Sequence, residues 1–203
     1  MNWIRPLYTL YQRLLKVGVT DELSFAEKLR TELSNQFIIV AFPSAIFHLI
    51  YNFLTLNSYR GYVLVALWTC ILSFTLLLNY SKRYITARFF ISIFSLFLIA
   101  LCHVLFGWEQ RFEFMYLLFI LISCYLLERK FAIVMIALIL LTYTAVATYL
   151  TFYGPIFQIQ IIGSGTSAYF TFAIIITITL TAKMLRENYK YNQIVIQQNK
   201  VLE

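Results

Sequence analysis

Two histidines within long apolar runs are the side chains best suited to chemistry. His48 lies near the middle of the run Gln36–Leu56, and His103 lies towards the end of the run Ile85–Phe106. Ionisable groups at membrane depth are costly, so they mark either a functional site or a hydrogen bond between helices. Three interpretations stay open: a neutral histidine bonded between helices, a ligand pocket, and a haem or metal held by both rings. A depth offset of roughly one helical turn, at about 1.5 Å per residue, disfavours the third.

Polar and aromatic neighbours extend the ligand-pocket interpretation beyond the two histidines. Tyr51 and Asn52 follow His48 by about one helical turn, and Trp108 follows His103. Pockets for small molecules are mainly apolar and carry a few polar groups that orient the ligand. We therefore predict that these five residues bind a small apolar ligand.

No constellation of residues in the sequence is typical of an enzyme. There is no Ser/His/Asp set on the loops, no pair of carboxylates within a span and no metal-ligand motif. The segment Gly163–Gly165 lacks the preceding strand and the Lys-Ser/Thr ending that a phosphate-binding loop needs. The three cysteines have no spacing that suggests zinc or a disulfide framework. We expect no catalytic residue, no metal and no cofactor in this chain.

The composition identifies lipid as the solvent of most of the chain. Apolar and aromatic residues make up 61% of the sequence and charged residues 12%, whereas soluble domains carry about a quarter charged residues. The net charge of +7 comes from basic residues that flank apolar runs. That placement is typical of a membrane protein, so we expect a lipid bilayer and no nucleic acid as partner.

Six apolar runs are long enough, or nearly so, to cross a bilayer as helices, which takes about 20 residues each. The runs are Gln36–Leu56, Tyr62–Tyr80, Ile85–Phe106, Phe112–Leu127, Phe131–Tyr153 and Thr166–Ala182. Short connections between them predict an up-down bundle. We therefore expect an all-α membrane protein with cytoplasmic helices at residues 1–34, a six-helix transmembrane domain at 35–182 and a signalling helix at 183–203. Pro43 should kink the first span, as a packing feature or as a hinge.

Basic residues are distributed unequally between the two sides of this bundle. Of the 16 Lys and Arg residues, all but Arg60 and Arg111 fall on the side that holds both termini. Loops rich in Lys and Arg stay in the cytoplasm. This predicts a multi-pass protein of the bacterial inner membrane with both termini cytoplasmic, and it places the predicted pocket in the outer half of the bundle.

The first residues of the chain have the pattern of a helix that lies on a membrane surface. Apolar side chains recur at helical spacing over Met1–Lys16, and Arg5, Arg13 and Lys16 occupy other positions. Gly18 ends this helix, and a second helix leads into the first span. These helices serve either as a simple anchor or as a contact for the helix at 183–203 of the same dimer.

The last segment is a polar helix with the spacing of a coiled coil. Its seam residues alternate at intervals of three and four and are Leu185, Asn188, Asn192, Val195, Asn199 and Leu202. Asparagine at a seam position fixes the register and favours a parallel dimer. A second, rival seam begins at Met184. Two alternative seams on one helix are what a connector that shifts its register would need. We expect a homodimer whose paired helices lead to a cytoplasmic output domain in the full-length protein.

Together these features resemble the six-helix membrane regions of bacterial sensor histidine kinases and of class III nucleotide cyclases. The resemblance rests on the pre-span helix Asp21–Asn35, the six short-looped spans, and the stretch His103–Leu118 (HVLFGWEQRFEFMYLL). The stretch Asn192–Glu203 (NQIVIQQNKVLE) resembles the start of a kinase dimerisation coil. The resemblance implies a receptor for a small ligand that passes a conformational bias to a catalytic domain.

The chain departs from those families because the catalytic parts are missing from its residues. The phosphoacceptor histidine, the nucleotide-binding domain and the cyclase core are not among the 203 residues. We therefore expect no enzymatic activity from this segment itself. The alternatives to a sensor are a membrane anchor that dimerises a cyclase, and a small transporter.

Overall fold

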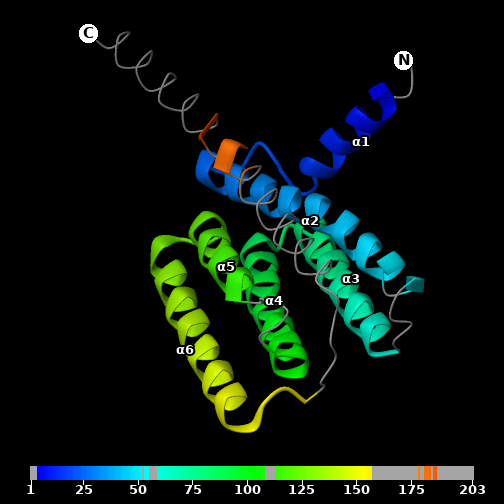
Figure 1. Cartoon of the computed structure of the whole chain (residues 1–203). Coiled ribbons are helices and arrows are strands. Elements are labelled where there is room, and N and C mark those ends of the chain that lie inside the picture. The colour runs from blue at the N-terminus through cyan, green and yellow to red at the C-terminus, as the bar shows by residue number, and fades with distance from the viewer. Residues whose placement is uncertain are drawn as a thin grey trace.

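The fold is known from a computed structural model, which describes residues 4–51, 53–54, 59–107, 113–156, 178, 181–183 and 185–186. Every regular element within these ranges is a helix (Figure 1). The helices are α1 (Ile4–Leu15), α2 (Phe25–Tyr51), α3 (Tyr59–Tyr80), α4 (Tyr84–Phe106), α5 (Glu113–Leu126) and α6 (Arg129–Tyr153). The predicted all-α class is confirmed for this part of the chain.

Four of the helices are long and apolar enough to cross a membrane. The segments that meet this criterion are Phe25–Ile50, Gly61–Tyr80, Tyr84–Phe106 and Arg129–Tyr153. Helix α5, which corresponds to the fourth predicted span, is apolar but has only 14 residues. The sixth predicted span lies mostly outside the described residues, so the count of six stays a prediction.

Helix α2 joins two segments that the sequence analysis separates. The predicted boundary at residues 34 and 35 falls inside this continuous helix of 27 residues. The helix also continues through Pro43, whose side chain is exposed. The Ser44 hydroxyl donates to the carbonyl of Ala41 at 2.7 Å, which satisfies polar groups beside the proline. A hinge at Pro43 remains a prediction.

Aromatic contacts join the helices inside the bundle. The ring of Phe37 on α2 is edge-on to Trp68 on α3 at 6.3 Å between centroids, and to Phe119 on α5 at 6.1 Å. Tyr116 on α5 lies 5.3 Å from Tyr143 on α6. These contacts bring α2, α3, α5 and α6 around a common core, with one face of α4 buried beside them.

Large apolar side chains also cover the outward faces of the helices. Leu77 on α3, Phe97 on α4 and Leu141 on α6 are 55%, 64% and 68% exposed. Soluble monomers rarely expose apolar surface over so many elements, whereas helices in lipid do so as a rule. Exposure and length together indicate a membrane protein.

The connections between helices gather at two opposite ends of the bundle (Figure 1). We call the end with the α1–α2, α3–α4 and α5–α6 connections the elbow end. At the other end, the amide of Ile156 donates to the carbonyl of Val104 at 3.2 Å, and Gly107 packs against Pro155. The basic connections that the sequence analysis assigns to one side therefore do share one end.

Candidate functional site

The predicted ligand pocket falls partly within the described residues. Tyr51 is the last residue of α2, but its side chain is not described, and Asn52 and Trp108 lie outside the described ranges. His48 and His103 are both described. Only these two members can therefore be placed.

His48 makes its described polar contact within its own helix. Its Nδ1 atom lies 2.6 Å from the carbonyl oxygen of Ser44, one turn earlier on α2. Its ring is edge-on to Phe47 at 5.9 Å between centroids. The side chain is half-buried, close to the end of α2 remote from the elbow.

His103 lies in the interior of the bundle. It is fully buried on α4, and its ring centroid is 5.8 Å from that of Tyr116 on α5. Tyr116 in turn contacts Tyr143 on α6, so three rings from three helices form one row. The contacts described for the two histidines thus involve different helices.

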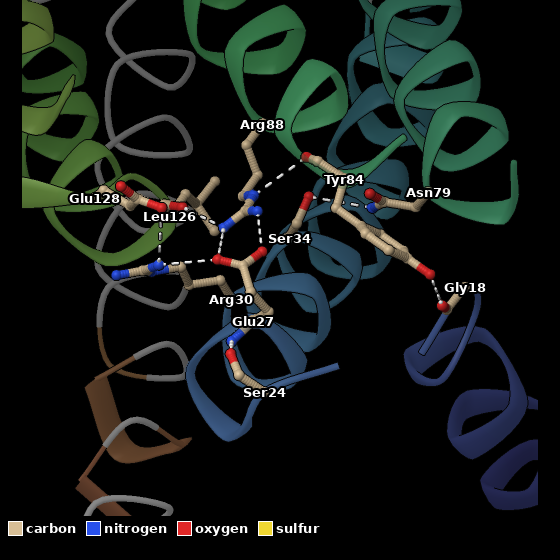
Figure 2. Close-up of polar contacts among 10 residues, drawn as sticks. All are labelled: Gly18, Ser24, Glu27, Arg30, Ser34, Asn79, Tyr84, Arg88, Leu126 and Glu128. Atoms are coloured by element: carbon tan, nitrogen blue, oxygen red, sulfur yellow. Dashed lines mark hydrogen bonds and ion pairs between the residues drawn. The ribbon is translucent and has the colours of Figure 1, made fainter. Parts of the chain in front are cut away.

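A second set of polar residues lies at the elbow end and centres on Arg88 (Figure 2). The Arg88 side chain is 4% exposed. Its guanidinium donates to both carboxylate oxygens of Glu27 on α2. It also donates to the carbonyls of Leu126, at 3.3 Å, and of Tyr84, at 3.1 Å. Because Leu126 ends α5, Arg88 supplies a donor to a carbonyl that the helix itself leaves open.

Glu27 is shared between two arginines. Besides Arg88, it accepts a bond from Nη1 of Arg30 at 2.9 Å, and Arg30 also lies 3.8 Å from Glu128 before α6. The Ser24 hydroxyl accepts from the Glu27 amide at 3.3 Å at the start of α2. One carboxylate on α2 is thereby linked to α4 directly and to the α5–α6 turn through Arg30.

Two asparagines fasten the chain between α1 and α2 to the bundle. The Asn35 amide donates to the carbonyls of Leu15, at 3.0 Å, and Val17, at 2.8 Å. The Asn79 amide donates to the Asn35 side-chain oxygen at 2.8 Å and to Ser34 at 3.3 Å. Both asparagines are buried. The Asn35 amide thus satisfies carbonyls at and just after the end of α1, and the Asn79 amide holds the Asn35 side chain in place.

Gly18 lies at the closest approach between the α1–α2 connection and the end of α3. It has a φ of 77°, and a Cβ atom at this position would lie 2.0 Å from the carbonyl oxygen of Asn79. The Tyr84 hydroxyl donates to the Gly18 carbonyl at 2.5 Å. Only glycine fits both the backbone conformation and the close approach. Gly18, Asn35, Asn79 and Tyr84 form what we call the elbow clamp.

The segment that begins the predicted signalling helix reaches the same end of the bundle. The Lys183 ammonium lies 2.8 Å from the Glu32 carboxylate on α2. The hydroxyls of Tyr125 on α5 and Thr181 are 3.2 Å apart. This is a contact within one chain between α2 and the start of the 183–203 segment, whereas the contact that the sequence analysis considers is one within a dimer.

Of the predicted seam residues of the signalling helix, one lies within the described part of the chain. Leu185 is described and is 64% exposed. The other seam positions lie outside the described residues and are Asn188, Asn192, Val195, Asn199 and Leu202. The coiled coil therefore stays a prediction.

Apart from Gly18, named as the end of the first helix, the sequence analysis gave no role to the residues of these contacts. Arg88 lies within the predicted span Ile85–Phe106, and a charge at that depth is itself a signal that a partner exists. Glu27 on the pre-span helix is a carboxylate at the matching end of its helix. Nothing in the spacing of Asn35 and Asn79 indicates that they meet.

Among the residues with a described structure, no group of three or more His, Cys, Asp or Glu side chains could hold a metal ion. Comparison of the chain with protein-family models, curated proteins and solved structures gives no match. Function is therefore inferred from the contacts within this chain.

Proposed function

We propose that the chain is the membrane input module of a dimeric bacterial receptor of the histidine-kinase kind. It would sense a small apolar ligand in the outer half of the bundle and bias a cytoplasmic output domain. The observation that carries the proposal is the ion pair between Lys183 and Glu32. It fastens the segment leading to the output side onto α2, the helix that carries His48 towards its other end.

Helix α2 is suited to transmit a change because it joins the predicted ligand side to the polar contacts at the elbow end. Near one end is the half-buried His48, and near the other are Glu27 and Glu32, paired with α4 and with the 181–183 segment. A ligand shifts a conformational balance only through unequal affinity for the two states. A ligand that contacts His48 or His103 would therefore act by favouring one placement of α2.

The carboxylate of Glu27 is the ionic link between α2 and α4 that such a movement would change. It bonds Arg88 on α4 and Arg30 one turn later on α2, so a movement of α2 away from α4 weakens the pair with Arg88 and leaves the pair within α2 in place. Packed interfaces have discrete alternative arrangements rather than a continuous range. In the proposal, the pair with Arg88 stabilises one end state of the signal, and the pair with Arg30 keeps the Glu27 carboxylate partnered in the other.

The test fuses residues 1–203 to a histidine-kinase core and measures autophosphorylation in membranes. Lys183→Glu and Glu32→Lys should each change basal output by roughly fivefold, since coupling energies are on the order of 1 kcal/mol. The double exchange should restore it, because the pair is re-formed with reversed charges. Lys28→Glu, at the exposed pair with Asp21, is the matched control and should leave output unchanged.

Other outcomes would favour the alternatives. If neither single exchange alters output, and His48→Leu and His103→Leu are also silent, the chain acts only as an anchor and dimeriser. Solute flux into liposomes through the isolated chain would favour a transporter. Asn192→Ile with Asn199→Ile tests the coil: an unchanged output would remove it as the transmitter.

A further inference from the structure

Helix α1 carries an apolar face that the described part of the chain covers only at one end. Leu15 is buried and Leu14 is half-buried where α1 meets α2. Leu10 and Leu7, one and two turns before Leu14 on the same face, are 53% and 57% exposed. Exposed leucines aligned on one helical face mark a surface that binds something apolar.

The charged residues of α1 and of the position just after it are all basic. Arg5, Arg13 and Lys16 are exposed on or just after the helix, and Ile4–Leu15 contains no Asp or Glu. An apolar stripe opposite a purely basic face is typical of helices that lie at the surface of an anionic membrane. Long basic side chains can reach lipid phosphates while the leucines enter the acyl region.

The position of α1 brings it to the boundary of the membrane-spanning helices. The elbow clamp ties its end to the α3–α4 turn through Gly18, Asn79 and Tyr84. From there α1 extends obliquely outward, up and away from the bundle, rather than back over it (Figure 1). A bilayer around the bundle would therefore contact α1 near the end at which this helix joins the bundle.

We propose that α1 binds the anionic lipid surface on the elbow side of the membrane, with Leu7 and Leu10 inserted and the three basic residues at the headgroups. Asn35 bonds the carbonyls of Leu15 and Val17, so the bound helix is held to α2. The lipid surface thereby restrains the end of α2 that carries Glu27 and Glu32. This goes beyond ligand sensing and does not depend on it.

The test places a photo-crosslinking amino acid at position 7 of the full chain in lipid nanodiscs. The matched control carries it at position 9, which is also exposed but lies on the opposite side of α1. With phosphatidylglycerol present, position 7 should form lipid adducts in several-fold greater yield than position 9. Nanodiscs of phosphatidylcholine alone should lower the yield at position 7.

A triple variant tests the charge requirement. Arg5→Gln, Arg13→Gln and Lys16→Gln together should lower the lipid adducts, by up to roughly fivefold for each basic residue that reaches the surface. Equal lipid yields at positions 7 and 9, or yields independent of phosphatidylglycerol, would overturn the proposal. So would adducts at position 7 that join two copies of the chain. No ligand or output domain enters this experiment, so its failure leaves the sensor proposal intact.

Discussion

The buried guanidinium of Arg88 on α4 and the half-buried carboxylate of Glu27 on α2, 61 residues apart in sequence, form an ion pair (Figure 2). Burying an ion pair is favourable only when its remaining donors and acceptors are satisfied. Arg88 meets that condition through the carbonyls of Tyr84 and Leu126, and Glu27 through Arg30. The pair therefore fixes the position of α2 along the length of α4.

Removing one partner of this pair should be costly. Glu27→Gln leaves the Arg88 charge buried without a counter-ion and should lower the free energy of unfolding by about 3 kcal/mol. The double variant with Arg88→Met should cost less than the sum of the single changes. Unfolding in bicelles by steric trapping measures both. Lys28→Gln, at an exposed pair, is the control and should cost no more than about 0.5 kcal/mol. Additive effects at Glu27 and Arg88 would contradict the coupling.

The elbow should tolerate no side chain at Gly18. Gly18→Ala adds a Cβ atom 2.0 Å from the Asn79 carbonyl oxygen, in a backbone conformation with φ 77°. Gly154→Ala is the matched control, because its φ is 71° but nothing lies within 4 Å of the new atom. The control should cost about 2 kcal/mol from backbone strain alone, and Gly18→Ala roughly 2 kcal/mol more from overpacking. Equal losses of thermal stability or of folded yield would show that the close approach is unimportant.

Asn35 should control whether α1 stays docked. Asn35→Leu leaves the carbonyls of Leu15 and Val17 and the amide of Asn79 without this partner, which should cost about 2 kcal/mol. Hydrogen exchange should then rise in residues 15–19 before it rises in the bundle. Thr9→Ala removes only a bond to the Arg5 carbonyl within α1 and serves as control. Unchanged exchange in Asn35→Leu would mean that packing alone holds the elbow.

The two ends of α6 should face opposite sides of the membrane. Lys130 and Tyr153 are exposed near its start and at its end. With the native cysteines replaced by alanine, Tyr153→Cys should react with an impermeant maleimide in intact spheroplasts, because the basic elbow end is expected in the cytoplasm. Lys130→Cys should react only after lysis. Labelling of both positions from one side would mean that α6 does not cross, and the reverse pattern would invert the orientation.

Helical class and approximate spans could be read from the sequence because they depend on local composition. The long apolar runs leave a backbone in lipid no alternative to helix, whatever they pack against. Alternating short connections likewise place the Lys82–Arg83 and Arg129–Lys130 turns at one end, and the structure agrees. The predicted pocket shows the limit of this reasoning. The sequence indicates His48 and His103, but it does not indicate which side chains contact either ring.

Contacts across the bundle were decided only by the tertiary structure. In water, a polar outer face reveals which side of a helix is buried, but in lipid both faces are apolar. Phe37 is fully buried and Phe97 is 64% exposed, yet the two are the same residue in similar runs. The rotation and height of each helix, and with them the meeting of Glu27 with Arg88 and of Asn35 with Asn79, follow from packing that local sequence does not encode.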